Sequence, residues 1–173
     1  MNKKQSLLVP VLLNKTHNKK SFDCGNPALN SFLQNYALQN IKNNSSRTYV
    51  SLCNKEKQIA GYYSLTYGSI SHVEATEKIK KHMPNYPIPV MVLGRLAVSK
   101  NYQKIGLGKS LLRDAIFRTL EASNIAGLKA IIAHAKNVSA KEFYLKYGFE
   151  ESSFDAYHLM LGLQDIEHTL TDE

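Results

Sequence analysis

The chain has 173 residues, of which 43% are hydrophobic and 21% charged, values typical of one soluble globular domain that spans residues 1–173. No run of 18 or more apolar residues occurs, which excludes a membrane-spanning helix. Lysine and arginine outnumber aspartate and glutamate by 22 to 14, a formal net charge of +8. This excess indicates either a solvated basic surface or a polyanionic partner such as nucleic acid.

The N-terminal stretch MNKKQSLLVPVLL has two lysines and a short apolar run, but no small-residue cleavage site. We therefore predict a first strand over residues 7–13 rather than a signal peptide. The two cysteines, Cys24 and Cys53, match no metal-site spacing. Without a secretion signal, we expect reduced thiols, a cytoplasmic location and no metal.

The first half of the chain predicts a loop, a helix and a hairpin. Residues 14–22 are polar and basic, and the following segment up to Asn26 precedes Pro27, which is a helix-capping signal. Apolar residues then recur at helical spacing to about Ile41. An alternating strand over 47–53, a charged turn over 54–57 and an aromatic-rich strand over 58–70 predict a hairpin.

The second half alternates strands and helices. A short helix is predicted over 75–82, and three prolines then force an extended entry into an apolar strand over 90–98. Within that strand Gly94 indicates a bulge or a close backbone approach. A helix over 107–120, a strand over 129–133, a helix over 139–147 that stops at Gly148, and two strands within 149–163 follow. This order predicts a mixed α/β sheet flanked by helices.

The turn Gln103-Lys104-Ile105-Gly106-Leu107-Gly108 lies between a strand and a helix. Such a turn points several backbone N–H groups at one place, where the helix dipole adds positive potential, so it predicts a phosphate cradle. With Lys109-Ser110 the turn is similar to a nucleoside-triphosphate P-loop. That motif requires a glycine where this chain has Gln103, and no acidic strand-end residue for magnesium is evident, so the P-loop is disfavoured.

The pattern Gln-x-x-Gly-x-Gly after a strand resembles the pyrophosphate loop of the Gcn5-related N-acetyltransferases, the GNAT superfamily. The phrase FYLKYGF, from Phe143 to Phe149, is a second signature of that superfamily. Four longer segments resemble the toxins of bacterial type II toxin–antitoxin modules that acetylate the amino acid on charged tRNA. They are FDCGNPALNSFLQNYALQN, GYYSLTYGSI, PIPVMVLGRLAVSKNYQKIGLGKSLLRDAI and AHAKNVSAKEFYLKYGF.

The resemblance implies a GNAT fold with a central mixed six- to seven-stranded sheet, acetyl-CoA as co-substrate and no metal. It also implies aminoacyl-tRNA as acceptor, a ribbon-helix-helix antitoxin as partner and a homodimer. The net charge suits a tRNA partner. Two alternatives stay open: an acetyltransferase of a small-molecule or protein amine, and a non-enzymatic module that binds CoA or nucleic acid.

The resemblance assigns the donor site to one strand and the turn after it. Backbone groups of the strand would pair with the pantetheine arm, and one N–H group would stabilise the developing oxyanion. The amides of the turn would bind the pyrophosphate, with Lys104 and Lys109 adding charge. The implied set is Leu96, Ala97, Val98, Gln103, Lys104, Ile105, Gly106, Leu107, Gly108, Lys109, Ser110, Asn137 and Phe143.

Tyr144 matches the position of the superfamily's general acid, and its reference pKa of about 10 keeps it protonated at neutral pH. Its neighbours Phe143 and Tyr147 share helical spacing and are also expected in the core. Asn137 either bonds the cofactor arm or caps a helix. No general base stands out, which suits an esterified α-amine, since its pKa lies below the usual value of about 7.7–8.0.

A lysine acceptor would need a base, for which Glu142 and His134 are candidates; otherwise we expect His134 to be structural. Arg95 lies in an apolar strand, where a charge requires a partner, so it either pairs with a carboxylate or faces the acceptor cleft near the tRNA end. The remaining basic residues expected to contact tRNA phosphates are Lys15, Lys19, Lys20, Lys42 and Arg47.

Overall fold

The computed structural model describes residues 7–53 and 57–166, which divide into two compact units. The first unit contains the chain up to Thr66 together with Arg95–Ala115, and the second contains Tyr67–Gly94 and the chain from Ile116 onward. Seven strands form a sheet in the order β1-β2-β3-β4-β5-β7-β6. Only β4 and β5 form a parallel pair among the registers determined, so the predicted mixed sheet is confirmed.

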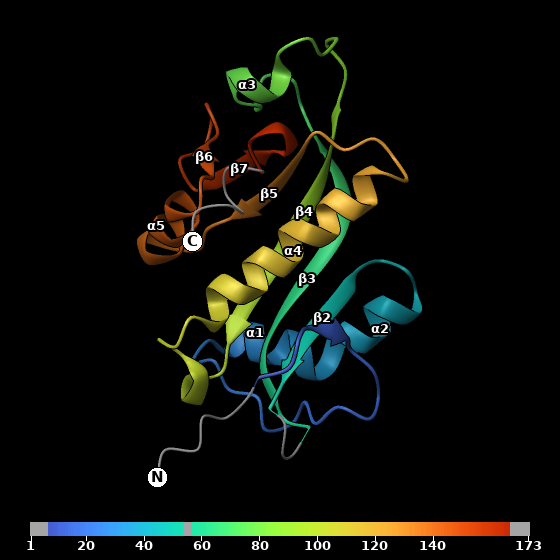
Figure 1. Ribbon diagram of the computed structural model, residues 1–173, viewed down its shortest axis with the longest axis vertical. Coiled ribbons are helices and arrows are strands. Elements are labelled where there is room, and N and C mark those ends of the chain that lie inside the picture. Colours follow the sequence, from blue (N-terminus) through green and yellow to red (C-terminus); the bar gives the residue numbers. More distant parts are fainter. Residues whose placement is uncertain (1–6, 54–56, 167–173) are drawn as a thin grey trace. The chain divides into compact units, whose positions relative to one another are not determined.

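In the first unit, β1 (Val11–Leu12), β2 (Arg47–Leu52) and β3 (Ile59–Ile70, whose first part lies here) pair antiparallel (Figure 1). The predicted hairpin is therefore confirmed, although residues 54–56 of its turn lie outside the described residues. The first strand is shorter than predicted. Pro10, which has no backbone N–H, separates β1 from an isolated bridge between Leu7 and Cys53.

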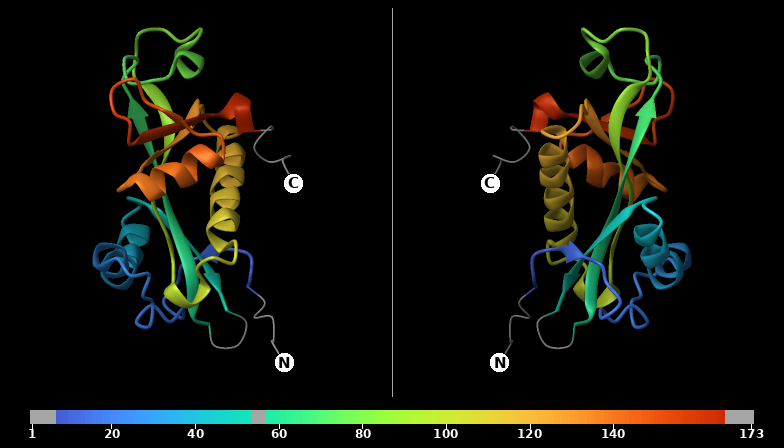
Figure 2. Two further views of the ribbon diagram at one scale, coloured as in Figure 1. Left: turned by 90° about the vertical axis from the view of Figure 1, so that its left-hand side faces the viewer. Right: turned by 90° about the vertical axis from the view of Figure 1, so that its right-hand side faces the viewer.

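The predicted N-terminal helix is confirmed, but it is not continuous. It consists of α1 (Pro27–Ser31), the π-helix η1 (Phe32–Tyr36) and α2 (Ala37–Lys42). Asn26 caps it, because its Oδ1 accepts hydrogen bonds from the N–H groups of Ala28 at 3.0 Å and Leu29 at 3.3 Å. Figure 2 shows these helices on one side of β2 and β3, where Phe32 and Leu33 enter a core with Tyr62.

In the second unit, the first part of β4 (Ile88–Val98) pairs with β5 (Ala130–His134), which pairs antiparallel with β7 (His158–Gly162). The edge strand β6 (Glu150–Glu151) follows α5 (Val138–Lys146), which ends before Gly148 at a φ of +89°. The predicted short helix is α3 (Glu77–Lys80), capped by Thr76. The core of this unit contains Ile79, Val90, Ile132 and Met160.

The long helix α4 (Leu107–Ser123) starts where predicted and runs beyond the predicted end. The remaining helical turns are η2 (Lys100–Tyr102) and η3 (Leu163–Asp165). The register between β4 and β5 ends at Leu93 and Ala133, just before Gly94. A Cβ atom at Gly94 would meet no atom of the described chain within 4 Å, so a close approach by another segment of the chain does not explain this glycine. No helix within the described ranges is long and apolar enough to cross a membrane.

Candidate active site

The glycine-rich turn has the backbone geometry of an anion cradle. Gly106 has a φ of +88°, in the left-handed region that glycine reaches without strain, and Lys104 also has a positive φ of 63°. Because α4 begins at Leu107, the N–H groups of its first turn have no partner inside the helix. They lie at the positive end of the helix dipole. Ser110 differs, since its N–H bonds Gly106 O at 3.2 Å.

Gln103 connects this turn to the end of β4 through its side chain. Its Nε2 donates to Val98 O at 2.9 Å and to Cys24 O at 3.1 Å. Its own N–H is directed to Lys100 O at 3.5 Å. The side chain of Gln103 therefore shapes the cradle, while the role expected for its backbone amide stays a prediction.

A second connection runs from Asp23, which the sequence indicated only as part of a helix start. The carboxylate accepts from Lys100 Nζ at 2.8 Å, from Gly25 N at 2.9 Å and from Asn30 Nδ2 at 2.9 Å. The bond from Lys100, followed by those from Gly25 and Asn30, lowers the pKa of Asp23 to about 2. The segment that precedes α1 is thus tied to the residues just before the glycine turn.

The predicted pantetheine edge is the end of β4, which alternates in burial. Ala97 is 5% exposed and packs in the core with Phe32 and Tyr62, whereas Leu96 and Val98 are half-buried. Val98 O already accepts the Gln103 side chain, and a carbonyl oxygen has a second lone pair for another donor. The role of the three residues toward pantetheine stays a prediction.

Arg95 has an aromatic partner rather than a carboxylate. Its Cζ lies 3.7 Å from the centroid of the Phe32 ring, a cation–π contact. Among the described residues it has no ion pair or hydrogen bond, so no carboxylate of the described ranges is its partner. Arg95 borders a cavity of about 450 Å³. The other lining residues are Ala28, Ser31, Phe32, Tyr36 and Asn40.

Two of the basic residues expected to contact phosphates are engaged within the fold. Arg47 donates to Ile41 O at 3.3 Å, to Ser46 O at 3.4 Å and to Asn44 Oδ1 at 2.8 Å, which closes the carboxyl end of α2. Lys19 donates to Gln34 O at 3.1 Å. Phosphate contacts from these residues and from the exposed Lys15, Lys20 and Lys42 stay predictions.

In the second unit, Tyr144 lies on α5 with only 8% of its surface exposed. Its ring centroid lies 5.3 Å from those of Phe143 and Phe149, and Phe143 also contacts Tyr147 at 5.2 Å. Phe143 and Tyr147 are half-buried rather than in the core as expected, although their rings pack together. Burial raises the pKa of Tyr144 to about 12, so the hydroxyl keeps its proton at neutral pH. That hydroxyl has no hydrogen-bond partner in the described part of the chain.

Asn137 is the N-cap of α5, where its Oδ1 accepts from Ala140 N at 2.8 Å. The helix-capping alternative is thus confirmed. A bond to the cofactor arm stays a prediction, for which the side-chain NH₂ group is an available donor.

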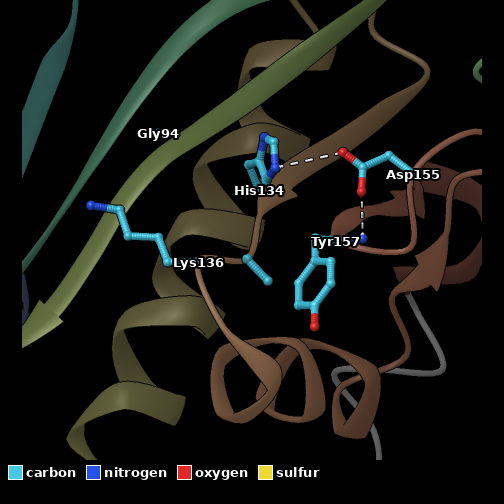
Figure 3. A pocket seen from close by; sticks show the side chains of 6 residues that line it. Gly94, His134, Lys136, Asp155 and Tyr157 are labelled. Atoms are coloured by element: carbon cyan, nitrogen blue, oxygen red, sulfur yellow. Dashed lines mark hydrogen bonds and ion pairs between the residues drawn. The ribbon is translucent and has the colours of Figure 1, made fainter.

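His134 lies at the end of β5 with 69% of its side chain exposed, although we expected a structural residue. Its Nε2 lies 3.7 Å from Asp155 Oδ2, and its ring stacks on His158 at 5.6 Å. Asp155 Oδ1 accepts from Tyr157 N at 2.8 Å (Figure 3). Glu142, the other candidate base, is exposed on α5.

These side chains border a second cavity of about 630 Å³, which the sequence did not indicate (Figure 3). Its lining residues are Gly94, His134, Ala135, Lys136, Asp155 and Tyr157. No local motif marks Lys136, Asp155 or Tyr157. The sequence predicted only that Asp155 and Tyr157 lie near the turn between the last two strands. In the described residues no three His, Cys, Asp or Glu side chains could hold a metal ion, and Cys24 and Cys53 are free thiols.

Comparison with known proteins identifies the family of this chain. The family model of the acetyltransferase (GNAT) domain matches residues 16–158. A protein of Mycobacterium tuberculosis described as a tRNA-acetylating toxin is 40% identical over 152 residues, which cover 88% of this chain and 90% of that protein.

Two solved structures are similar over nearly their whole length. AtaT complexed with acetyl-methionyl-tRNAfMet has a TM-score of 0.88 and 28% identity, covering 96% of this chain and 100% of that one. A mutant AtaT toxin bound to the C-terminus of the antitoxin AtaR and acetyl-CoA has a TM-score of 0.79 and 26% identity, covering 96% and 99%. This chain belongs to the GNAT acetyltransferases.

Proposed function

We propose that this protein is a toxin that transfers an acetyl group from acetyl-CoA to the amino group of aminoacyl-tRNA and thereby blocks translation. The observation that carries the proposal is the 40% identity with the tRNA-acetylating toxin across 88% of the chain. The net charge of +8 supports a polyanionic acceptor. The protein acts in the cytoplasm, where charged tRNA is found.

All of the proposed donor-binding residues except Asn137 and Phe143 lie in the first unit. The amides that begin α4, the left-handed turn at Gly106 and the charges of Lys104 and Lys109 fit a pyrophosphate group. The backbone of Leu96, Ala97 and Val98 pairs with the pantetheine arm as an added strand does. Ile105, Gly108, Ser110, Asn137 and Phe143 complete the proposed donor-binding set.

Acetyl-CoA supplies the acetyl group as an activated thioester. A backbone N–H group at the end of β4 polarises the thioester carbonyl. Tyr144 donates a hydrogen bond from its hydroxyl group to the departing sulfur. With its pKa raised to about 12, Tyr144 holds the proton more tightly than a thiol, whose reference pKa is about 8.5. Its contribution is therefore a hydrogen bond that stabilises the developing negative charge.

The acceptor amine determines whether a base is needed. The α-amine of an aminoacyl ester is largely neutral at physiological pH, because its pKa lies below about 7.7–8.0. It can attack without prior loss of a proton to the protein, and its own proton then neutralises the sulfur. This chemistry agrees with a site in which Tyr144 is the main catalytic group.

A second candidate function is the acetylation of a lysine-like amine. The exposed His134, 3.7 Å from Asp155 and bordering a cavity, favours it, because an amine with a reference pKa of about 10.4 requires a base.

The AtaT–AtaR structure supports an antitoxin partner, which we propose to be a ribbon-helix-helix protein. We further propose that the chain forms a homodimer. The family match from residue 16 to residue 158 draws on both compact units and supports one domain over residues 1–173.

The direct test incubates the purified protein with labelled acetyl-CoA and charged total tRNA. We expect label that mild alkali releases as an N-acetyl amino acid, and none on uncharged tRNA. The Tyr144→Phe variant should give little label under the same conditions. Absence of label on every charged tRNA, together with label on a lysine-containing peptide, would replace the first function by the second.

A further inference from the structure

The cavity beside Arg95 contains a cation whose hydrogen-bond donors have no protein partner. Arg95 is half-buried, and its guanidinium lies over the ring of Phe32, itself 4% exposed, at 3.7 Å. Its five N–H donors make no hydrogen bond or ion pair with residues that the structure describes. A half-buried cation of this kind is costly to leave unpaired, so a ligand that supplies acceptors or a stacking face is favoured.

The opposite residues of the cavity offer an aromatic ring and a side-chain amide. Tyr36 borders the cavity and is 59% exposed, so much of its ring is accessible to a ligand. Asn40 uses its backbone carbonyl for Ser45 N at 2.9 Å. Its side-chain amide, which carries both a donor and an acceptor, has no bond to the described chain.

The helix that forms this cavity departs from α-helical geometry at that point. The π-helix η1 begins at Phe32 and ends at Tyr36, and the N–H of Ala37 bonds Phe32 O. Such turns are rare and occur frequently at functional sites. Here the turn directs Phe32 into the core and leaves Tyr36 exposed.

We infer that this cavity binds an unpaired nucleobase at the 3′ end of the acceptor RNA, with the base stacked on Arg95 and Tyr36. The inference rests on the proposed function. Unpaired RNA bases are recognised by stacking on aromatic rings and arginine planes and by hydrogen bonds to their edges, and the cavity offers all three. Its volume of about 450 Å³ accommodates a nucleoside.

The position of Arg95 on β4 places this cavity next to the proposed donor edge. Arg95 directly precedes Leu96, and a strand rises by about 3.3 Å per residue, so the whole donor edge lies within about 10 Å along one strand. In a charged tRNA the terminal base and the esterified amino acid share one ribose. Binding the base here therefore brings the amine to the strand that holds the thioester.

The test compares two acceptors of one amino acid: the charged tRNA, which has the terminal base, and the methyl ester, which lacks it. For Tyr36→Ala we expect the ratio of kcat/KM for tRNA to kcat/KM for the ester to fall by roughly 5- to 150-fold, the range of one base–aromatic stack. Arg95→Lys should lower the ratio as well, although it keeps the charge, because lysine lacks the planar face. Tyr67→Ala, which removes a tyrosine of similar exposure (62%) outside the cavity, should leave the ratio unchanged.

Binding of the trinucleotide CCA, followed by NMR titration, separates this inference from the proposed function. Wild-type protein should bind CCA more tightly than the same trinucleotide with an abasic last position, and Tyr36→Ala should abolish the difference. An unchanged ratio of activities, or equal binding of the two trinucleotides by wild type, overturns the inference. Base-dependent binding of CCA without acetylation of any charged tRNA supports the cavity assignment and refutes the toxin function instead.

Discussion

Replacing Tyr144 by phenylalanine removes one hydroxyl group and nothing else from a buried ring. The ring contacts with Phe143 and Phe149, with centroids 5.3 Å apart, persist in the variant. The hydroxyl has no partner among the described residues, so its removal leaves no protein group unpaired. We therefore expect the free energy of unfolding to stay the same or to rise by about 1 kcal/mol.

The catalytic effect of the same change should be large. Loss of one positioned hydrogen-bond donor to developing negative charge costs about 10²–10³ in rate, so kcat should fall by that factor. The affinity for acetyl-CoA, measured by calorimetry, should not change, because the hydroxyl is assigned to the departing sulfur rather than to ground-state binding. The assay is single-turnover acetyl transfer to a charged tRNA.

Tyr62→Phe is the matched control. The Tyr62 side chain is fully buried, and its hydroxyl donates to Leu29 O at 2.7 Å. Removing that hydroxyl leaves the half-buried Leu29 carbonyl with only the Phe32 N–H as donor, so the protein should lose about 1 kcal/mol of stability while each folded molecule keeps its activity. The two variants thus separate the catalytic role of a tyrosine hydroxyl from a structural role.

The pH dependence of stability follows from the raised pKa of Tyr144. Burial raises the folded-state value to about 12, whereas an unfolded tyrosine titrates near 10. Between these values the unfolded state binds fewer protons, so stability falls as pH rises. At pH 11 this effect should cost the wild type about 1.4 kcal/mol that the Tyr144→Phe variant does not lose.

Urea denaturation of both proteins at pH 8 and pH 11 measures this difference. If Tyr144→Phe keeps the wild-type kcat, the proposed role of the Tyr144 hydroxyl at the departing sulfur is refuted. If it destabilises the protein as much as Tyr62→Phe does, the hydroxyl has a partner, and the argument from its burial fails.

Three further predictions concern the donor site and the candidate base. Gln103→Ala removes two hydrogen bonds worth about 1 kcal/mol each, so the Kd for acetyl-CoA should rise by up to about 30-fold. The control Gln39→Ala, on the exposed face of α2, should leave this Kd unchanged. Gly106→Ala puts a side chain at a φ of +88°, which should lower the stability of the fold by about 1–2 kcal/mol and weaken acetyl-CoA binding. The control Gly127→Ala, in open space at an ordinary φ, should change neither the stability nor the binding. His134→Gln should leave the rate with charged tRNA within about tenfold of wild type; a loss of 10²-fold or more would establish His134 as a general base.

Local patterns predicted the elements that carry the donor site. The caps, the strand before Gln103 and the helix after it each depend on residues close in sequence, and their types were correct. The left-handed conformation at Gly106 also follows from the tight turn that a strand-to-helix connection requires. Where local propensity and tertiary structure agree, a single sequence is informative.

Features that depend on residues far apart could not be predicted in this way. Arg95 and Phe32 contact each other only because β4 packs against the N-terminal helix, and helical periodicity does not distinguish the π-turn at Phe32 from an α-turn. Similarly, Asp155 approaches His134 because β5 and β7 pair in register, a long-range pairing that no local pattern encodes. The sequence therefore indicated the local structure of the proposed donor site, but not the contacts of Arg95 and His134 with residues far away in the chain.

The residue that argued against a nucleotide P-loop is also the one that gives this turn its shape. A glycine at position 103 would add flexibility, but it could not reach Val98 O and Cys24 O at once, as the side-chain amide does. Together with the Lys100–Asp23 ion pair, these bonds connect the end of β4, the turn and the segment before α1.

A strand end tied to the turn keeps a fixed spacing between the backbone groups of β4 and the amides that begin α4. A long donor with an extended arm and a pyrophosphate requires this spacing, whereas a triphosphate held by one loop does not. For this reason Gln103→Ala should reduce binding of acetyl-CoA more than binding of free pyrophosphate, and equal losses for both ligands would show that Gln103 serves the phosphate cradle alone.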